Sequence, residues 1–482
     1  MMQDSSNLTP HLCVIGAGAG GLAAAAAAAA MGAPVVLIEK DRIGGQNLYT
    51  GSVPSKALLA AAERRDALRS GARFAVKSIR TPVDFAAVNA HVRHAVETVA
   101  PQNSAERFGG LGVRVITGTA RFTDPNTVAV GDRTIKARRF VIATGSSPVI
   151  PDLPGLSETP YLTPETVFDL ADCPRHLIVV GAGRIGLELA QTFRRLGAEV
   201  TVVEAATPLR REDRECADVV LDALAGEGIR LRTGVQIVQV RRSFARVQLV
   251  LAQPAENAAG EEEIIEGTHL LITAGRRAQI DDLDLHAAGI RHEPQRVLVD
   301  KRLRTSNKNV YAIGDVIGGP RFTHVATHHA GIVVRNALFR HSIAVDPRVI
   351  PRVTFTDPEL AQVGLLEDEA RTCAGTIRIL RWAYRENDRA ATTGAIRGHI
   401  KIITDRRGRI LGTTLVGAAA GENITAWALG VGQRLSIGAF AGLTVPYPTY
   451  AEVGKRAAIT YFMRGLTTAR VRRIIGWLRR SG

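Results

Sequence analysis

A strand–glycine turn–helix–strand pattern occurs twice in this chain and limits its fold more than any other feature. The first copy starts with the apolar run His11–Ile15, passes through Gly16, Gly18 and Gly21 into an alanine-rich stretch, and ends with Val35–Glu39. Short apolar runs bounded by glycine turns are typical of buried parallel strands, so this order predicts a βαβ unit. The glycines permit a tight turn, and N–H groups at the start of the helix can bind a pyrophosphate. The copy therefore predicts an α/β fold with a dinucleotide site.

The second copy repeats this order and spacing. Its strands and glycines are Leu177–Val180, Gly181, Gly183, Gly186 and Val200–Val203. In each copy an acid follows the first glycine by 23 positions, Glu39 in the first and Glu204 in the second. A carboxylate there can accept hydrogen bonds from a ribose, and at Glu204 it would repel the 2′-phosphate of NADP, which favours NADH over NADPH. Two such units predict two dinucleotides that face each other, an arrangement suited to electron transfer.

The segment Gly44–Lys56 reads GGQNLYTGSVPSK. It resembles the active-site segment of the class I pyridine nucleotide-disulfide oxidoreductases, in particular those similar to mercuric reductase and lipoamide dehydrogenase. In that family the segment reads G-G-x-C-x-x-x-x-C-x-P-S-K, and its two cysteines form a redox-active disulfide beside a flavin. Here Asn47 and Ser52 occupy the two cysteine positions. With further motifs in the family's order, the resemblance extends from about His11 to Ala458.

The resemblance implies a glutathione reductase-like architecture: two Rossmann-like domains for FAD and NAD, and a C-terminal α+β dimerisation domain. The boundaries that we expect are 1–155 and 276–350 for the two parts of the FAD domain, 156–275 for the NAD domain, 351–460 for the interface domain and 461–482 for a basic tail. Alternating apolar runs separated by turns after Pro351 also predict an antiparallel sheet flanked by helices. The interface domain implies a homodimer.

The family's binding residues carry over to matching positions of this chain. Those expected to hold FAD are Gly16, Gly18, Gly21, Glu39, Gly45, Lys56, Thr144, Gly145, Gly314 and Asp315. Those expected to hold NAD are Gly181, Gly183, Gly186, Glu204 and Gly275. By the same resemblance, Asp315 binds the ribityl chain, and Lys56 lies near flavin N5 in an ion pair with Glu188.

The chain lacks the residues of the family's disulfide chemistry. The family's H-P-x-x-x-E segment, which brings a histidine base from the partner subunit, here begins with Tyr447 and ends with Glu452. A phenol with an ordinary pKa near 10 is a poor base at neutral pH, and neither Asn47 nor Ser52 can carry two electrons. The four cysteines, Cys13, Cys173, Cys216 and Cys373, are far apart in sequence. The sequence thus predicts no dithiol relay, and mercury reduction, which needs thiolates, is doubtful.

The leading prediction is an FAD enzyme that takes hydride from NADH and passes electrons directly to a small external acceptor, with a quinone preferred. Asn47, Ser52 and Tyr447 are expected to line the acceptor's pocket, and Glu452 is a further candidate catalytic residue. Two alternatives stay open: a soluble transhydrogenase between NAD and NADP, and a catalytically silent flavoprotein that acts as a nucleotide sensor or scaffold.

The net charge of +15 is spread along the chain without a recognised nucleic-acid-binding fold, so no nucleic-acid partner is expected. The tail differs, because Arg464–Arg480 holds six arginines and no acid. Its apolar residues share one helical face: Val471, Ile474, Ile475 and Leu478. This pattern suits either an anionic membrane surface or docking on the tail's own dimer. With no signal pattern or long apolar run, we expect a cytoplasmic protein, with the inner face of the membrane as an alternative place of contact.

No metal is expected. His324 and His328 lie four residues apart, the spacing of one helix face, and His329 follows. No glutamate completes an H-E-x-x-H motif. Flavin contact or packing is therefore the preferred interpretation of these histidines.

Overall fold

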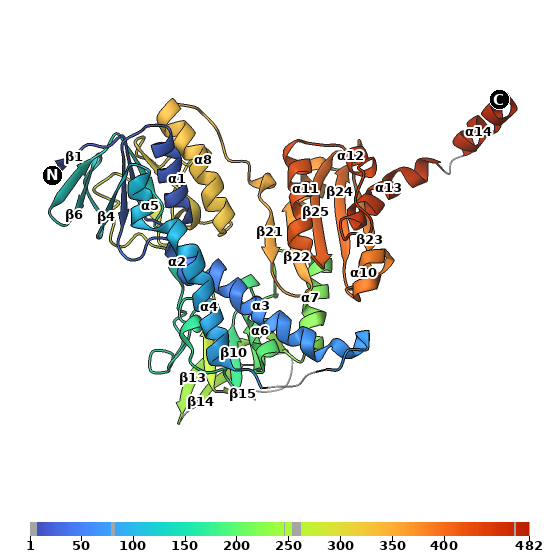
Figure 1. The fold of residues 1–482 in the computed structure, drawn as a ribbon, viewed down its shortest axis with the longest axis horizontal. Coiled ribbons are helices and arrows are strands. Elements are labelled where there is room, and N and C mark those ends of the chain that lie inside the picture. The colour runs from blue at the N-terminus through green and yellow to red at the C-terminus, as the bar shows by residue number, and fades with distance from the viewer. Residues whose placement is uncertain (1–6, 79–81, 245, 253–261, 467–468, 482) are drawn as a thin grey trace. The chain divides into compact units, whose positions relative to one another are not determined.

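The computed structural model describes residues 7–78, 82–244, 246–252, 262–466 and 469–481 (Figure 1). The chain divides into two compact units, and each is described by itself. The first consists of Met1–Gly181, Thr192–Val203 and Val235–Val345. The second consists of Ala182–Gln191, Glu204–Gly234 and Asp346–Gly482.

A five-stranded parallel sheet forms the centre of the first unit, in the order β20-β8-β2-β3-β4. Its strands are β2 (Leu12–Ile15), β3 (Val35–Glu39), β4 (Val113–Thr117), β8 (Arg139–Ile142) and β20 (Val310–Ala312). Helices α1 (Ala19–Ala30) and α8 (Thr323–Phe339) share one hydrophobic core with this sheet (Figure 1). Gly20 of α1 lets the two helices approach closely, since a Cβ there would lie 3.1 Å from Cβ of Ala326 on α8.

A smaller sheet contributes to a second core in the same unit, in the order β1-β7-β6-β5. Its strands are β1 (Asn7–Leu8), β5 (Arg121–Asp124), β6 (Thr127–Val130) and β7 (Arg133–Lys136). Helices α2 (Gly45–Tyr49), α3 (Ser52–Arg69), α4 (Phe85–Val99) and α5 (Ala105–Gly110) connect β3 to β4. The segment Gly44–Lys56 therefore forms the short helix α2 and the first turns of α3.

The second copy of the strand–glycine turn–helix–strand pattern also lies on parallel strands. Strand β10 (His176–Val180) pairs with β16 (His269–Ile272) and with β11 (Glu199–Glu204). An antiparallel sheet follows, formed by β13 (Gln236–Ser243), β14 (Arg246–Ala252) and β15 (Glu262–Gly267). The short strand β9 (Ser146–Pro148) pairs with β17 (Arg276–Ala278). In the chain, β9 follows β8 and β17 follows β16.

The second unit is built on a five-stranded antiparallel sheet in the order β21-β22-β25-β24-β23. Its strands are β21 (Arg352–Thr354), β22 (Glu359–Gly364), β23 (Ile377–Ala383), β24 (His399–Asp405) and β25 (Ile410–Gly417). The further elements of this unit include α7 (Arg214–Gly226), β12 (Arg230–Thr233), α9 (Glu367–Ala374), α10 (Asp388–Thr393), α11 (Ala420–Gly432), α12 (Ile437–Ala441), α13 (Glu452–Leu466) and α14 (Ala469–Ser481). Helices α11 to α13 share the sheet's core, in which the rings of Trp427 and Phe440 stack 4.0 Å apart.

The predicted fold class is confirmed, with two parallel nucleotide-type sheets and a C-terminal antiparallel sheet flanked by helices. Helix α6 (Arg184–Leu196) follows the second glycine turn as expected. The predicted domain boundaries stay predictions. Within the described ranges, no helix has the length and apolar character needed to cross a bilayer.

Candidate functional site

The first glycine turn is held in place by close backbone contacts. A Cβ on Gly16, whose φ is +102°, would lie 2.5 Å from the carbonyl oxygen of Ala143, so only glycine fits there. No described atom lies within 4 Å of the corresponding position on Gly18, which leaves open space beside the start of α1. Glu39 Oε2 accepts a hydrogen bond from the backbone N–H of Ala17 at 2.6 Å. The turn and the carboxylate expected to bind a ribose are therefore fixed to each other.

The second glycine turn repeats this construction. In the first unit, a Cβ on Gly181 would lie 2.8 Å from the carbonyl oxygen of Thr273. In the second unit, Gly183 again has no described atom within 4 Å of its Cβ position. Glu204 Oε2 accepts from the N–H of Ala182 at 2.8 Å, as Glu39 does from Ala17. Gly186 lies within α6.

Four further predicted FAD residues, Thr144, Gly145, Gly314 and Asp315, lie at the carboxyl ends of parallel strands in the first unit. Thr144 and Gly145 follow β8, and Asp315 follows β20. The Asp315 carboxylate accepts a hydrogen bond from the Ser146 hydroxyl at 2.7 Å. Oγ1 of Thr144 is buried without a hydrogen-bond partner among the described residues, as expected of an atom that contacts a bound group. This orphaned hydroxyl and the open space at Gly18 fit a bound FAD.

His329 of α8 holds the backbone beside Asp315. Its Nδ1 accepts a hydrogen bond from the N–H of Gly314 at 3.3 Å. Burial lowers the pKa of His329 to about 4, so the ring is neutral near pH 7 and can accept that bond. The packing interpretation is thus supported for His329, and the described residues contain no group of side chains suited to holding a metal ion.

A network of hydrogen bonds that the sequence did not predict links Asp315 to α2. Arg276, whose side chain is only 10% exposed, donates to the Ser146 hydroxyl at 2.8 Å and to the Glu165 carboxylate at 3.0 Å. Gln46 donates to the same carboxylate oxygen at 2.8 Å. A buried guanidinium with two partners fixes both. The chain from Asp315 to Gln46 therefore positions the residue that precedes Asn47.

Thr323, the first residue of α8, joins the two positions where the family carries cysteines. Its hydroxyl donates to Asn47 Oδ1 at 2.8 Å and lies 3.3 Å from the Ser52 hydroxyl. The four cysteines, Cys13, Cys173, Cys216 and Cys373, are free thiols. Burial raises the pKa of Cys13 and Cys216, which suppresses their thiolates.

The other catalytic candidates have these surroundings. Lys56 lies on α3 in the first unit, and Glu188 lies on α6 in the second, where its carboxylate accepts from the N–H of Phe355 at 2.9 Å. Their ion pair stays a prediction. Tyr447 is exposed and donates its phenolic hydrogen to Asp388 at 2.7 Å, a bond that raises its pKa. The phenol is therefore an even poorer base than an ordinary tyrosine.

Glu452 is the first residue of α13 and accepts from Arg456 at 2.9 Å, an i,i+4 pair.

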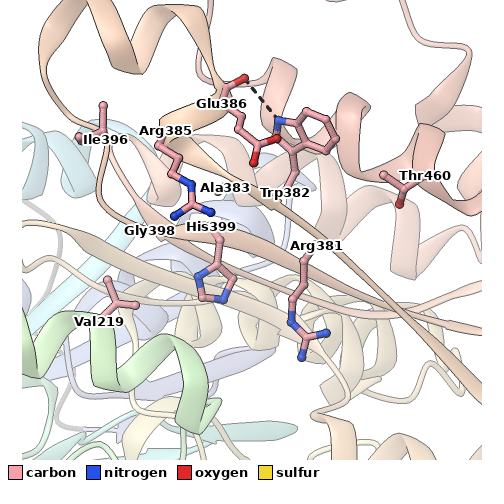
Figure 2. A pocket seen from close by; sticks show the side chains of 10 residues that line it. All are labelled: Val219, Arg381, Trp382, Ala383, Arg385, Glu386, Ile396, Gly398, His399 and Thr460. Carbon is pink, nitrogen blue, oxygen red and sulfur yellow. Dashed lines mark hydrogen bonds between the residues drawn. The ribbon is translucent and has the colours of Figure 1, made fainter.

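A pocket of about 580 Å³ also lies in the second unit, lined by residues that include Arg381, Arg385 and His399 (Figure 2). None of the predicted site residues lines it. It gives no support to a catalytic role.

The two glycine turns share one construction. Each has a carboxylate fixed beside it, and the first also has a buried hydroxyl without a hydrogen-bond partner among the described residues. This arrangement is typical of an oxidoreductase that binds a flavin and a nicotinamide dinucleotide. Residues 10–330 match the model of the pyridine nucleotide-disulphide oxidoreductases, and residues 350–458 match that of their dimerisation domain. The chain belongs to the pyridine nucleotide-disulphide oxidoreductase family. It is an FAD-dependent pyridine nucleotide oxidoreductase, and the dimerisation domain supports a homodimer.

Two curated relatives and two solved structures match this chain over almost their whole length. The chain is 36% identical to mercuric reductase of Streptomyces lividans, over 93% of this chain and 96% of that protein. It is 33% identical to dihydrolipoyl dehydrogenase of Thermus scotoductus, over 92% and 95%. Among solved structures, the flavoprotein disulfide reductase RclA of Escherichia coli superposes with a TM-score of 0.83 at 26% identity, over 94% of this chain and 99% of that one. LpdA of Mycobacterium tuberculosis gives 0.84 at 27%, with the same coverage.

Proposed function

We propose that this protein takes hydride from NADH and delivers two electrons to an external quinone-type acceptor without a disulfide relay. The observation that carries the proposal is the bridge at the family's cysteine positions, where Thr323 joins the side chains of Asn47 and Ser52. None of these groups can be oxidised and reduced in turnover. Electrons that reach this place must therefore pass to a molecule from outside.

Bound FAD supplies the two-electron relay between the nicotinamide and the acceptor. The residues of the chain bind and orient the reactants. The first glycine turn and Glu39 hold the FAD pyrophosphate and ribose, and Asp315, fixed by Ser146, receives the ribityl chain. Glu204, fixed to its own turn, accepts from the 2′-hydroxyl of NADH and repels a 2′-phosphate, so NADH is the preferred donor.

Anaerobic mixing of the holoenzyme with NADH tests the first half of the proposal. Loss of the flavin's visible absorbance is expected, followed by its recovery when a quinone is added. A flavin that stays oxidised while NADH binds would instead indicate a nucleotide sensor or scaffold. Rapid recovery with NADP⁺ but not with quinones would indicate a transhydrogenase.

We further propose that α14 brings the enzyme to an anionic membrane surface, where quinones dissolve. Ile474, Ile475 and Leu478 are exposed, and Trp477 is 68% exposed. Exposed cations lie on the same helix: Arg472, Arg473, Arg479 and Arg480. At about 1 kcal/mol for each cation near an anionic surface, four cations give roughly 4 kcal/mol, or close to a thousandfold in partitioning.

Co-sedimentation with vesicles tests this contact. The intact protein should sediment with vesicles that contain phosphatidylglycerol and stay in solution with phosphatidylcholine alone. The variant Arg472→Glu with Arg473→Glu should bind at least tenfold more weakly. The matched control changes Arg406 and Arg407, an exposed arginine pair between β24 and β25, to glutamate. Equal loss in both variants would mean that net charge, rather than α14, controls binding.

A further inference from the structure

The side chains at the two former cysteine positions form a directed chain of hydrogen bonds. The Thr323 hydroxyl has one hydrogen, which it donates to Asn47 Oδ1 at 2.8 Å. The contact of 3.3 Å between the hydroxyls of Thr323 and Ser52 must therefore be donated by Ser52. The direction of the chain runs from Ser52 through Thr323 to Asn47.

This direction determines which atoms of Asn47 remain for a ligand. Its Oδ1 is occupied by Thr323, so the carboxamide presents Nδ2 with two N–H groups. Nδ2 has no hydrogen-bond partner among the residues that the structure describes, and the side chain is partly exposed. The local structure thus offers a neutral pair of hydrogen-bond donors, held by its other end.

The residues next to Asn47 and Thr323 in the chain make contacts of their own. Gln46, the preceding residue, is fixed through Glu165 to the buried Arg276. On either side of Thr323, the rings of Phe322 and His324 stack with their centres 5.0 Å apart. An amide whose oxygen is fixed in this way presents its two N–H donors to a molecule that carries a carbonyl oxygen.

We propose that Asn47 is the polar anchor of the acceptor site and donates through Nδ2 to a carbonyl oxygen of a flat quinone. The proposal rests on the proposed function and names the contact that recognises the acceptor. Thr323 and Ser52 are positioning residues, since they act through Asn47. In the balanced reaction, quinone, NADH and one solvent proton give quinol and NAD⁺. The amide transfers no proton and stabilises the negative charge that develops on the carbonyl oxygen.

Titration of the oxidised holoenzyme with duroquinone, in the absence of NADH, tests the role of Asn47. The quenching of flavin fluorescence reports the binding. Asn47→Ala and Thr323→Val should each raise the Kd about 3- to 10-fold, the effect of one hydrogen bond. Thr323→Ser should restore the wild-type Kd, because it keeps the hydroxyl. The matched control is Thr327→Val, one turn further along α8, where the hydroxyl donates to the Thr323 carbonyl. Its Kd should not change.

Steady-state kinetics with duroquinone should show the same order. We expect a raised KM in Asn47→Ala and Thr323→Val, while NADH bleaches the flavin at the wild-type rate. Equal Kd values in wild type, Asn47→Ala and Thr323→Val overturn the anchor, as does a wild type that does not bind duroquinone. Neither outcome depends on turnover. A wild type whose flavin is not bleached by NADH defeats the proposed function instead.

Discussion

Removing the ammonium group of Lys401 tests how far the second unit depends on one buried cluster of charges. The Lys401 side chain is 6% exposed and contacts three carboxylates: Asp213 at 2.8 Å, Glu367 at 3.0 Å and Glu215 at 3.3 Å. Glu215 and Glu367 have arginine partners of their own, Arg381 and Arg371. Within the residues that the structure describes, Asp213 forms an ion pair with Lys401 only. We consider the variant Lys401→Met, which keeps most of the side chain's length.

The burial of both partners sets the magnitude. Asp213 is 4% exposed, and after the substitution it keeps its hydrogen bond from the N–H of Cys216 but loses its cation. Breaking a buried pair by removing one partner costs about 3–5 kcal/mol, because the other charge stays buried. The double variant Lys401→Met with Asp213→Asn should recover part of that loss, since asparagine can still accept from Cys216. The matched control is Arg348→Met, whose exposed pair with Asp346 should cost about 0–1 kcal/mol.

Tryptophan fluorescence during urea unfolding is the assay. All three tryptophans, Trp382, Trp427 and Trp477, belong to the second unit, so their emission reports on that unit. A loss below about 1 kcal/mol for Lys401→Met, or a double variant less stable than the single one, would refute the argument from burial.

The pH dependence of the same transition gives a second test. The hydrogen bond from Arg381 lowers the pKa of Glu215 from 4.5 to about 2. A depressed carboxyl pKa contributes stability that is present above the unfolded value and lost as pH falls through the folded value. Unfolding should therefore become easier between about pH 4.5 and pH 2, and Glu215→Gln should weaken that dependence.

Two further predictions concern the nucleotide sites, and a third concerns the two positions where the family carries cysteines. Glu204→Ala should lower kcat/KM for NADH about 10- to 100-fold, the effect of a charge-assisted bond, and narrow the preference over NADPH, as steady-state kinetics would reveal. Burial lowers the pKa of His329 from 6.5 to about 4, so the unfolded chain binds more protons than the folded chain between these pH values. The free energy of unfolding should therefore fall as pH drops through this range. FAD release, measured across the same range, should increase, because protonated Nδ1 cannot accept the hydrogen bond from the N–H of Gly314. Asn47→Cys with Ser52→Cys should create two thiols that titrate after NADH treatment and not before it, and unchanged thiol counts would argue against a disulfide at this site.

Much of the candidate site could be predicted from the sequence, because the patterns that mark it are local. The strand before Gly16, the alanine-rich helix after it and the acid at Glu39 all appear where the pattern placed them. The missing cysteines are matters of residue identity. The helical spacing in the tail likewise predicted α14. The Lys56–Glu188 ion pair, whose residues belong to different units, stays a prediction from the family resemblance.

Steric limits at glycine, apolar periodicity and side-chain chemistry act over a few residues, so the sequence was enough to predict the fold class, the two glycine turns and the loss of the cysteine pair. Which side chains meet at the two former cysteine positions depends on the tertiary structure. Thr323 meets Asn47 across 276 positions of sequence, and Arg276 meets Glu165 across 111. A hydroxyl or guanidinium can bond to any acceptor that the fold brings near it, so no local pattern marks such partners in advance.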